Sequence, residues 1–498
     1  MTNRIASIAL TVFYAIVILF VGCIPQDSLQ WSSDGSVGLL RTKDALYLVD
    51  GDTGKLTPIP DSNVWPWPGI SNNGKIIAYT LQLECNDLSQ TLNLLPPGQI
   101  KLLKNHARLM RDKIFRTGLV NGQFPSLGKP TSRDFTDSGG KDSFNENYRN
   151  WVIRYLCENA DGALAEKIGS DIIKKTKETK LTYFQLFTSP ASDPNARQLI
   201  ATSIQPLCLI RFSPDARLIG YLMQPFETHD MFEGGFDFYV ASTKQNVNAM
   251  LVDSTIAAGY DWRPDGRAVA YLKTDNYDGK QLSVGTLVEK TVVDADNELL
   301  ATPADPNKET SFATHTCTGE TKELAGTIFY PWIKAQYGRD GRIFFATAEL
   351  SLPSSKLEEE KWSLFCYDSL TAAVTDAVPR AAADFAGGNI HLFALSPDGT
   401  KLLLPGKKTT LGLYPLGSAP DLKQLLVPES EGFGDDLASF APAWKGNNEV
   451  SFLVSEKSHY LTADADTPHH RKEIVILDSQ GNLKQILSSD WPDLDLLK

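Results

Sequence analysis

The chain has 498 residues, a formal net charge of −12, and 42% hydrophobic and 10% aromatic residues. This hydrophobic content is typical of a globular protein and excludes extensive disorder. The acidic balance argues against nucleic acid as a partner, because surfaces that bind nucleic acids neutralise phosphates with Lys and Arg.

The first 23 residues have the pattern of an export signal. Arg4 precedes an uncharged, largely apolar run from Ile5 to Gly22, and Cys23 follows. A basic start, an apolar stretch and small residues at its end mark a targeting segment rather than folded structure. The run is also close to the roughly 20 residues that span a bilayer, so an uncleaved membrane anchor is an alternative interpretation. Secretion without an anchor is a further alternative.

The end of this run, Leu19-Phe20-Val21-Gly22-Cys23, resembles the lipobox of bacterial lipoproteins, although Phe20 departs from the usual Leu. The resemblance implies cleavage before Cys23 and lipidation of Cys23. Ile24 in place of Asp implies, in a Gram-negative envelope, the periplasmic face of the outer membrane. We therefore expect an extracytoplasmic protein of the cell envelope, held at the membrane by an N-terminal lipid or helix.

A turn phrase recurs through the rest of the chain. It consists of an aromatic or aliphatic residue, a short turn with Asp or Asn and usually Gly, and then an apolar run. Asp-Gly or Asn-Gly between apolar runs is the strongest short signal for a β-hairpin. The runs are continuously apolar, which indicates strands packed on both faces. The seven copies begin at Trp31, Ile70, Phe212, Trp262, Tyr337, Leu395 and Trp444.

Two copies carry a family resemblance. Phe212-Ser-Pro-Asp-Ala-Arg-Leu-Ile-Gly-Tyr221 and Leu395-Ser-Pro-Asp-Gly-Thr-Lys-Leu-Leu-Leu404 resemble the WD-like propeller repeats of TolB-type envelope proteins. The same repeats occur in the propeller domains of prolyl-oligopeptidase-like enzymes. The resemblance implies an all-β fold, a β-propeller of about seven four-stranded blades over residues 29–490. The resemblance does not extend to the α/β domain of TolB or to a hydrolase domain, so it predicts a fold rather than an activity.

Residues 98–180 interrupt the second blade with a predicted helical insertion. Gln99–Arg116 places apolar residues at helical spacing with Lys and Arg between them, and two more helices are expected over 145–158 and 161–178. We expect a cap over one mouth of the propeller, between the first blades (29–97) and the remaining blades (181–490). The basic helix is interpreted as a surface helix, with contact to anionic lipid headgroups as the alternative.

Candidate ligand-binding residues are aromatic or polar side chains next to the predicted strands. Two tryptophans beside the insertion form a possible platform, and two loops combine His with acidic residues. For both loops the alternative is an ordinary solvated loop, since neighbouring side chains on an extended backbone point apart. We expect no metal site and no cofactor. The candidates are Trp65, Trp67, Glu227, His229, Asp230, His469 and His470.

Five further cysteines are widely and irregularly spaced, without a Cys-x-x-Cys pair, which argues against a zinc site. An odd number leaves at least one thiol unpaired. Most are interpreted as buried single thiols, and one disulfide of Cys85 with Cys157 or Cys208 stays open.

No catalytic motif is present. The sequence lacks a Gly-x-Ser-x-Gly elbow, a Walker loop, His-Glu-x-x-His and Gly-x-Gly-x-x-Gly, so the corresponding enzyme classes are not favoured. We expect a binding or scaffold protein for another envelope protein or an extracytoplasmic ligand. The alternative is a propeller enzyme that acts on a peptide or glycan through loop Asp, Glu and His residues. A subunit that works only within a complex is a third possibility.

Overall fold

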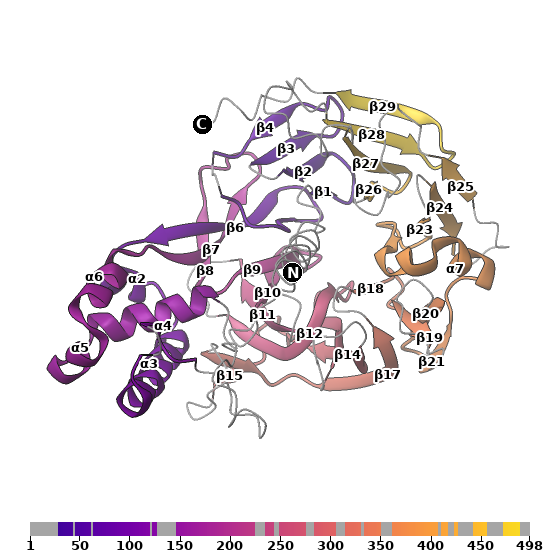
Figure 1. Cartoon of the computed structure of the whole chain (residues 1–498). Coiled ribbons are helices and arrows are strands. Elements are labelled where there is room, and N and C mark those ends of the chain that lie inside the picture. The colour runs from indigo at the N-terminus through magenta and orange to yellow at the C-terminus, as the bar shows by residue number, and fades with distance from the viewer. Residues whose placement is uncertain are drawn as a thin grey trace, which may run out of the picture.

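Figure 1 shows the computed structural model of the chain. It describes residues 28–488 apart from 43–44, 61–62, 120–121, 127–145, 225–234, 244–248, 275–282, 305–313, 330–332, 350–360, 407–409, 417–422, 427–441 and 456–471.

In these described residues, five four-stranded antiparallel sheets and one nine-stranded sheet surround a common centre (Figure 1). Each four-stranded sheet is formed by strands that follow one another in the chain. Their strands are β1 (Ser28–Trp31), β2 (Val37–Arg41), β3 (Leu46–Asp50) and β4 (Leu56–Pro58); β5 (Gly69–Ile70), β6 (Ile76–Cys85), β7 (Leu181–Pro190) and β8 (Gln198–Ser203); β18 (Ala335–Tyr337), β19 (Ile343–Glu349), β20 (Lys361–Asp368) and β21 (Ala373–Asp376); β22 (Ala394–Leu395), β23 (Lys401–Pro405), β24 (Thr410–Pro415) and β25 (Lys423–Leu426); and β26 (Ala443–Lys445), β27 (Glu449–Ser455), β28 (Lys472–Asp478) and β29 (Leu483–Ser488).

The nine-stranded sheet depends on one long strand, β12 (Met250–Trp262). The beginning of β12 pairs with β11, where Met250 lies opposite Val240, and its end pairs with β13, where Trp262 lies opposite Val269. Thr255 has a φ of +58°, so the backbone bends between the two halves. The other strands are β9 (Leu207–Phe212), β10 (Leu218–Met223), β11 (Phe236–Ser242), β13 (Ala268–Lys273), β14 (Ser283–Thr291), β15 (Ala301–Pro303), β16 (His315–Cys317) and β17 (Thr321–Phe329).

The first strands of the sheets contact one another around the centre. β1 contacts β5 and β26, β9 contacts β5 and β12, and β12 contacts β18. The first and last sheets meet through side chains: Trp31 Nε1 donates a hydrogen bond to Ser451 Oγ (2.7 Å), and Leu29 shares a core cluster with Ile474. The ring of sheets packed face to face makes the chain a β-propeller, as the recurring turns predicted. Within the described residues, no sheet mixes strands from the two ends of the chain.

The recurring turns explain why these segments form hairpins. In the first turn Ser32 Oγ (2.6 Å) and the Ser36 amide (3.0 Å) donate hydrogen bonds to Asp34 Oδ1, and Gly35 has a φ of +74°. The carboxylate thus fixes the turn, and glycine permits the left-handed backbone. An equivalent carboxylate or amide oxygen accepts from the amide two residues later at Asn73, Asp215, Asp265, Asp340 and Asp398.

The turn carboxylates predict a stability that falls in acid. The hydrogen bond from Ser32, reinforced by the Ser36 amide, lowers the pKa of Asp34 below its ordinary value. A group with a lowered folded pKa stabilises the fold above its unfolded pKa of about 3.9 and loses this contribution as the pH falls through the folded value. Urea unfolding between pH 7 and pH 3 is expected to show a smaller acid-side decline in Asp34→Asn than in the wild type. Identical pH profiles of the two proteins would contradict this assignment.

The described part of the segment between β6 and β7 contains five helices. The two strands pair with each other along their whole length, from Ile76–Pro190 to Cys85–Leu181. We call the five helices the helical unit: α2 (Leu88–Leu92), α3 (Pro97–Thr117), α4 (Glu146–Glu158), α5 (Gly162–Ile168) and α6 (Ser170–Glu178). The helix predicted over 161–178 is in fact two helices, because Gly169 has a φ of +94°. Helix α7 (Arg380–Ala386) and the 3₁₀ helix η2 (Gly387–Leu392) were not predicted.

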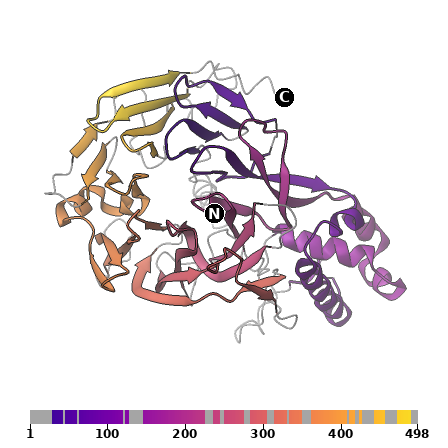
Figure 2. The same cartoon turned by 180° about the vertical axis from the view of Figure 1, so that it is seen from behind.

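The helical unit does not cover a mouth of the propeller, so the predicted cap is wrong. Figures 1 and 2 show the helices at the outer edge of the ring, seen from opposite sides, where β6 and β7 lead away from the centre. The physical reason is the apolar face of the helices. It forms one continuous cluster with residues of β6 to β12, which lie on the side of the ring.

Candidate functional site

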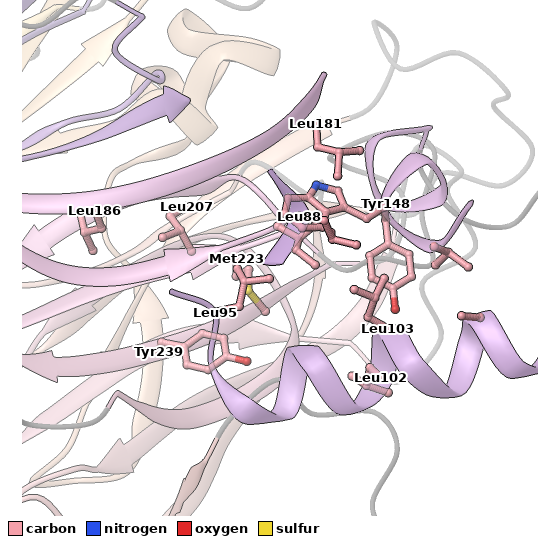
Figure 3. Packing of buried hydrophobic residues seen from close by; sticks show 14 of the residues in the cluster. Leu88, Leu95, Leu102, Leu103, Tyr148, Leu181, Leu186, Leu207, Met223 and Tyr239 are labelled. Carbon is pink, nitrogen blue, oxygen red and sulfur yellow. The ribbon is translucent and has the colours of Figure 1, made fainter. Parts of the chain in front are cut away.

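The core of the helical unit is shared with the propeller. Figure 3 shows Leu102, Leu103 and Tyr148 of the helices beside Leu207, Met223 and Tyr239 of the strands. All six side chains belong to one buried cluster. Burial of apolar surface stabilises such a contact by about 25 cal/mol per Å². The helices are therefore held firmly against the sheets.

Polar contacts add a defined orientation to this packing. The Gln99 side chain is 2% exposed; its Nε2 donates to Ser203 Oγ (3.1 Å) and its Oε1 accepts from the Ile204 amide (3.0 Å). Trp151 Nε1, on α4, donates to the Thr182 carbonyl (2.7 Å). Buried polar groups that are fully paired in this way specify one arrangement. The helical unit thus acts as a rigid extension of the β5–β8 sheet.

Arg154 connects the helices to one another from the inside. Its residue exposure is 4%, and its guanidinium donates to the carbonyls of Thr176 (3.0 Å) and Asn86 (2.7 Å) and to Glu158 Oε1 (2.6 Å). A further bond reaches the Thr179 carbonyl (3.0 Å). One buried cation therefore joins α4 to the end of α6 and to the beginning of α2.

The outward face of α3 carries a basic stripe. We give this name to Lys104, Arg108, Arg111 and Phe115, which are exposed and lie on one face because their spacing is four, three and four residues. The Arg111 guanidinium lies 5.7 Å from the centre of the Phe115 ring, and Leu109 beside them is 51% exposed. Cations next to exposed apolar side chains are typical of a surface that binds an acidic, partly apolar partner.

The charge of the helical region is opposite to that of the rest of the chain. Residues 98–180 contain 16 Lys and Arg against 10 Asp and Glu, a net charge of +6, whereas the remaining residues carry −18. A shallow hollow of about 740 Å³ lies at the far end of the unit, between α5 and α6. It is lined by Lys174 and Lys177 with Glu166 and Glu178, so it adds charges of both signs.

Charged side chains also lie on the inner strands of the ring. Asp261 on β12 accepts from Arg211 Nη1 on β9 (3.2 Å) and from the Tyr337 amide on β18 (2.9 Å). Trp262 Nε1 donates to the Arg211 carbonyl (3.2 Å), and Trp444 Nε1 donates to the Ala394 carbonyl in the same manner (2.9 Å). Trp444 thus joins two neighbouring sheets, whereas Trp262 joins two inner strands of the nine-stranded sheet.

The two predicted tryptophans occupy partly buried positions. Trp65 lies edge-on to Phe184, with the ring centres 5.0 Å apart, and its indole Nε1 is buried without a hydrogen-bond partner among the described residues. Trp67 has a φ of +64°, and its carbonyl accepts from the Ile210 amide (3.3 Å). Both pack against the core cluster of the nine-stranded sheet, while their role as a ligand platform stays a prediction.

The other predicted site residues lie outside the described residues. They are Cys23, Glu227, His229, Asp230, His469 and His470. Within the part of the chain that the structure describes, no three His, Cys, Asp or Glu side chains gather as metal ligands. None of the helices in that part is long and apolar enough to cross a bilayer.

The possible disulfide of Cys85 with Cys157 or Cys208 is not formed. All five described cysteines are free, and only Cys85 is partly exposed. Burial raises the pKa of the Cys157 and Cys208 thiols, which keeps them protonated and unreactive. The three residues lie on different elements, at the end of β6, inside α4 and on the inner strand β9.

Comparisons with known proteins found similarity to several solved propeller structures. No family model and no curated protein matches it. It is similar to TolB from Acinetobacter baumannii, with 15% identity over 62% of this chain and 60% of that chain and a TM-score of 0.35. It is also similar to the β-propeller domain of Myceliophteria thermophila Cps50 (Swd1), with 8% identity over 94% of this chain and 98% of that domain and a TM-score of 0.39.

A third similar structure is the β-propeller domain of the Trilobed protease from Pyrococcus furiosus, with 13% identity over 61% of this chain and 74% of that chain and a TM-score of 0.36. These likenesses are distant and concern the fold alone. The conclusion that the chain is a β-propeller rests on the ring of inner strands and on the side-chain contacts between the first and last sheets.

Proposed function

We propose that this protein is a membrane-tethered, extracytoplasmic β-propeller that acts as a binding or scaffold protein for another envelope protein. The N-terminal pattern that ends at Cys23 supports the tether and the compartment. The proposed anchor is a lipid on Cys23, with an uncleaved helix as the alternative.

The proposed ring has seven blades. β12 serves two of them, as the outer strand of the β9–β12 blade and the inner strand of the blade that contains β13, β14 and β17. The five four-stranded sheets are the other blades. This count agrees with the seven recurring turn phrases, and a rigid ring of this kind is suited to presenting an attached surface.

The observation that carries the binding proposal is the basic stripe on a rigidly attached helical unit. The unit contributes a charge of +6 to a chain that otherwise carries −18, and Leu109 and Phe115 remain 51% and 40% exposed beside its cations. Electrostatic complementarity guides association, and exposed apolar side chains at such a surface provide buried contact area after docking. The proposed partner is therefore an envelope protein with an acidic, partly apolar surface.

The test compares charge reversals at two places on the full-length protein. Lys104→Glu with Arg108→Glu reverses the basic stripe, and Lys55→Glu with Lys75→Glu makes the same change in charge at exposed turn lysines of the propeller. Each protein is crosslinked in salt-washed envelope membranes, and its partners are identified by mass spectrometry. The same digests report the mass of the N-terminal peptide and thus whether Cys23 carries a lipid.

We expect the wild type and the turn variant to recover the same acidic envelope protein and the stripe variant to lose at least about 90% of it, which corresponds to about 1.4 kcal/mol. Equal recovery by all three proteins would contradict binding through the stripe. Hydrolysis of a peptide or glycan panel without a specific partner would favour the enzyme alternative. An unmodified chain recovered from the soluble fraction would contradict the tether.

A further inference from the structure

The centre of the ring contains a lysine whose surroundings are unusual. Lys334 is partly exposed and directly precedes the inner strand β18. It lies against the backbone of β12 at Gly259, where an added Cβ would come within 2.5 Å of Lys334 Cβ. Its ammonium is 5.6 Å from the centre of the ring of Phe393, which is fully buried. Glycine at 259 and the phenylalanine thus define where the lysine lies.

The ammonium of Lys334 forms no hydrogen bond or ion pair with any residue that the structure describes. The nearby carboxylate of Asp261 is already bonded to Arg211 and to the Tyr337 amide. An ammonium group has three donors, and a cation–π contact satisfies none of them as a hydrogen bond. Lys334 therefore has donors available for a ligand.

The local charge is positive. Arg211, Asp261 and Lys334 come from three neighbouring inner strands or their ends, and they contribute two cations and one anion. The Arg211 side chain is 37% exposed, so part of its guanidinium is also open to a ligand. The hydroxyl of Tyr260, the other titratable group here, accepts from the Arg211 amide and holds that strand in place (3.1 Å).

Loss of hydration makes this arrangement costly in the absence of an anion. Enclosure by the surrounding strands, together with the positive charge of Arg211, lowers the pKa of Lys334 to about 7, although Asp261 acts in the opposite direction. A bound anion would restore the charged form and take up a proton at neutral pH.

From the placement of Arg211 on inner strand β9 and of Lys334 directly before inner strand β18, beside the hydrogen-bonded carboxylate of Asp261, we propose that the two cations form an oxyanion-binding site at the centre of the propeller. The ligand is a small solute or a partner group that carries a carboxylate or a phosphate. Lys334 donates from its ammonium, and Arg211 donates from the guanidinium edge that does not contact Asp261. The site lies on inner strands, separate from the basic stripe of α3, so it is independent of the proposed function above.

The test measures the reactivity of Lys334 in the full-length protein. Brief labelling with trace acetic anhydride modifies only neutral amines, and mass spectrometry reports each lysine separately. The pH of half-maximal labelling is determined in chloride and then, at equal ionic strength, in acetate, succinate or inorganic phosphate. Exposed Lys55 is the internal reference. Comparison of the carboxylates, acetate and succinate, with inorganic phosphate identifies which kind of oxyanion the site binds.

In chloride we expect half-maximal labelling of Lys334 near pH 7. At least one oxyanion should raise the value for Lys334 by a unit or more and decrease its labelling at pH 7 about five-fold. Arg211→Gln should abolish this protection. Circular dichroism and an unchanged Lys55 profile establish that the variant is folded.

Two results would overturn the proposal. One is a pH of half-maximal Lys334 labelling that is the same in chloride and in every oxyanion at concentrations up to tens of millimolar. The other is protection that persists in folded Arg211→Gln, which would show that the anion acts without the paired cations. Should that variant fail to fold, Lys334→Gln is used instead. If calorimetry shows that Lys334→Gln binds phosphate and succinate as tightly as the wild type does, the proposal is also overturned.

Discussion

Arg154→Met is expected to destabilise the helical unit by about 3 kcal/mol, because four hydrogen bonds from a buried guanidinium are lost at once. Methionine keeps the aliphatic part of the side chain, so the packing of α4 changes little. The carbonyls of Asn86, Thr176 and Thr179 lose their charged donor. Hydrogen exchange should show faster exchange in α2, α4 and α6, while the sheets remain protected.

The matched control is Arg111→Met in the same unit. Arg111 forms an ion pair with Asp161, but their side chains are 46% and 50% exposed, and exposed pairs contribute about 0–1 kcal/mol. This variant should leave the exchange of α2, α4 and α6 nearly unchanged. Equal effects of the two substitutions would show that loss of a positive charge, rather than loss of the buried bonds, weakens the unit.

Gly285→Ala is expected to cost about 3 kcal/mol or more in the free energy of unfolding. A Cβ at this position of β14 would lie 2.1 Å from the Lys273 carbonyl oxygen and 2.5 Å from the buried ring of Phe329. The first neighbour is backbone of β13, so relief requires the strands to separate. Urea unfolding followed by tryptophan fluorescence should show a lower midpoint than in the wild type.

Gly326→Ala provides the comparison on the adjoining strand. Gly326 on β17 lies opposite Thr286, the residue after Gly285, and an added Cβ meets no atom within 4 Å. The substitution should be neutral or slightly stabilising, by up to about 0.5–1 kcal/mol, because alanine loses less backbone entropy on folding than glycine. A similar loss of stability in both variants would exclude the close contact as the cause.

The hairpins of the propeller could be predicted from the sequence because their signals are local. Asp34 and Gly35, for example, form a turn through contacts within five residues. The helix expected over Gln99–Arg116 is found as α3 for the same reason. In each case spacing along the chain alone determines which residues meet.

The remaining features depend on contacts between distant segments. The dual pairing of β12 and the lateral position of the helical unit follow from packing against other sheets, which no local pattern contains. The Arg211, Asp261 and Lys334 cluster was also missed, because its members are 50 or more residues apart. The available signal was a charged residue inside or directly before an inner strand. These charged residues can be recognised as a cluster only when the strands are known to be neighbours.

The contact between the first and last sheets has a consequence for how the molecule is assembled. Many propellers close the ring with a sheet that combines strands from the N-terminal and C-terminal ends of the chain. In this chain Trp31 meets Ser451 through side chains, whereas each described four-stranded sheet uses one continuous stretch of sequence, apart from the helical unit between β6 and β7. Contacts between residues close in sequence form rapidly. Successive sheets can therefore be added vectorially to a growing arc, and the two chain ends need to find each other only in the final step.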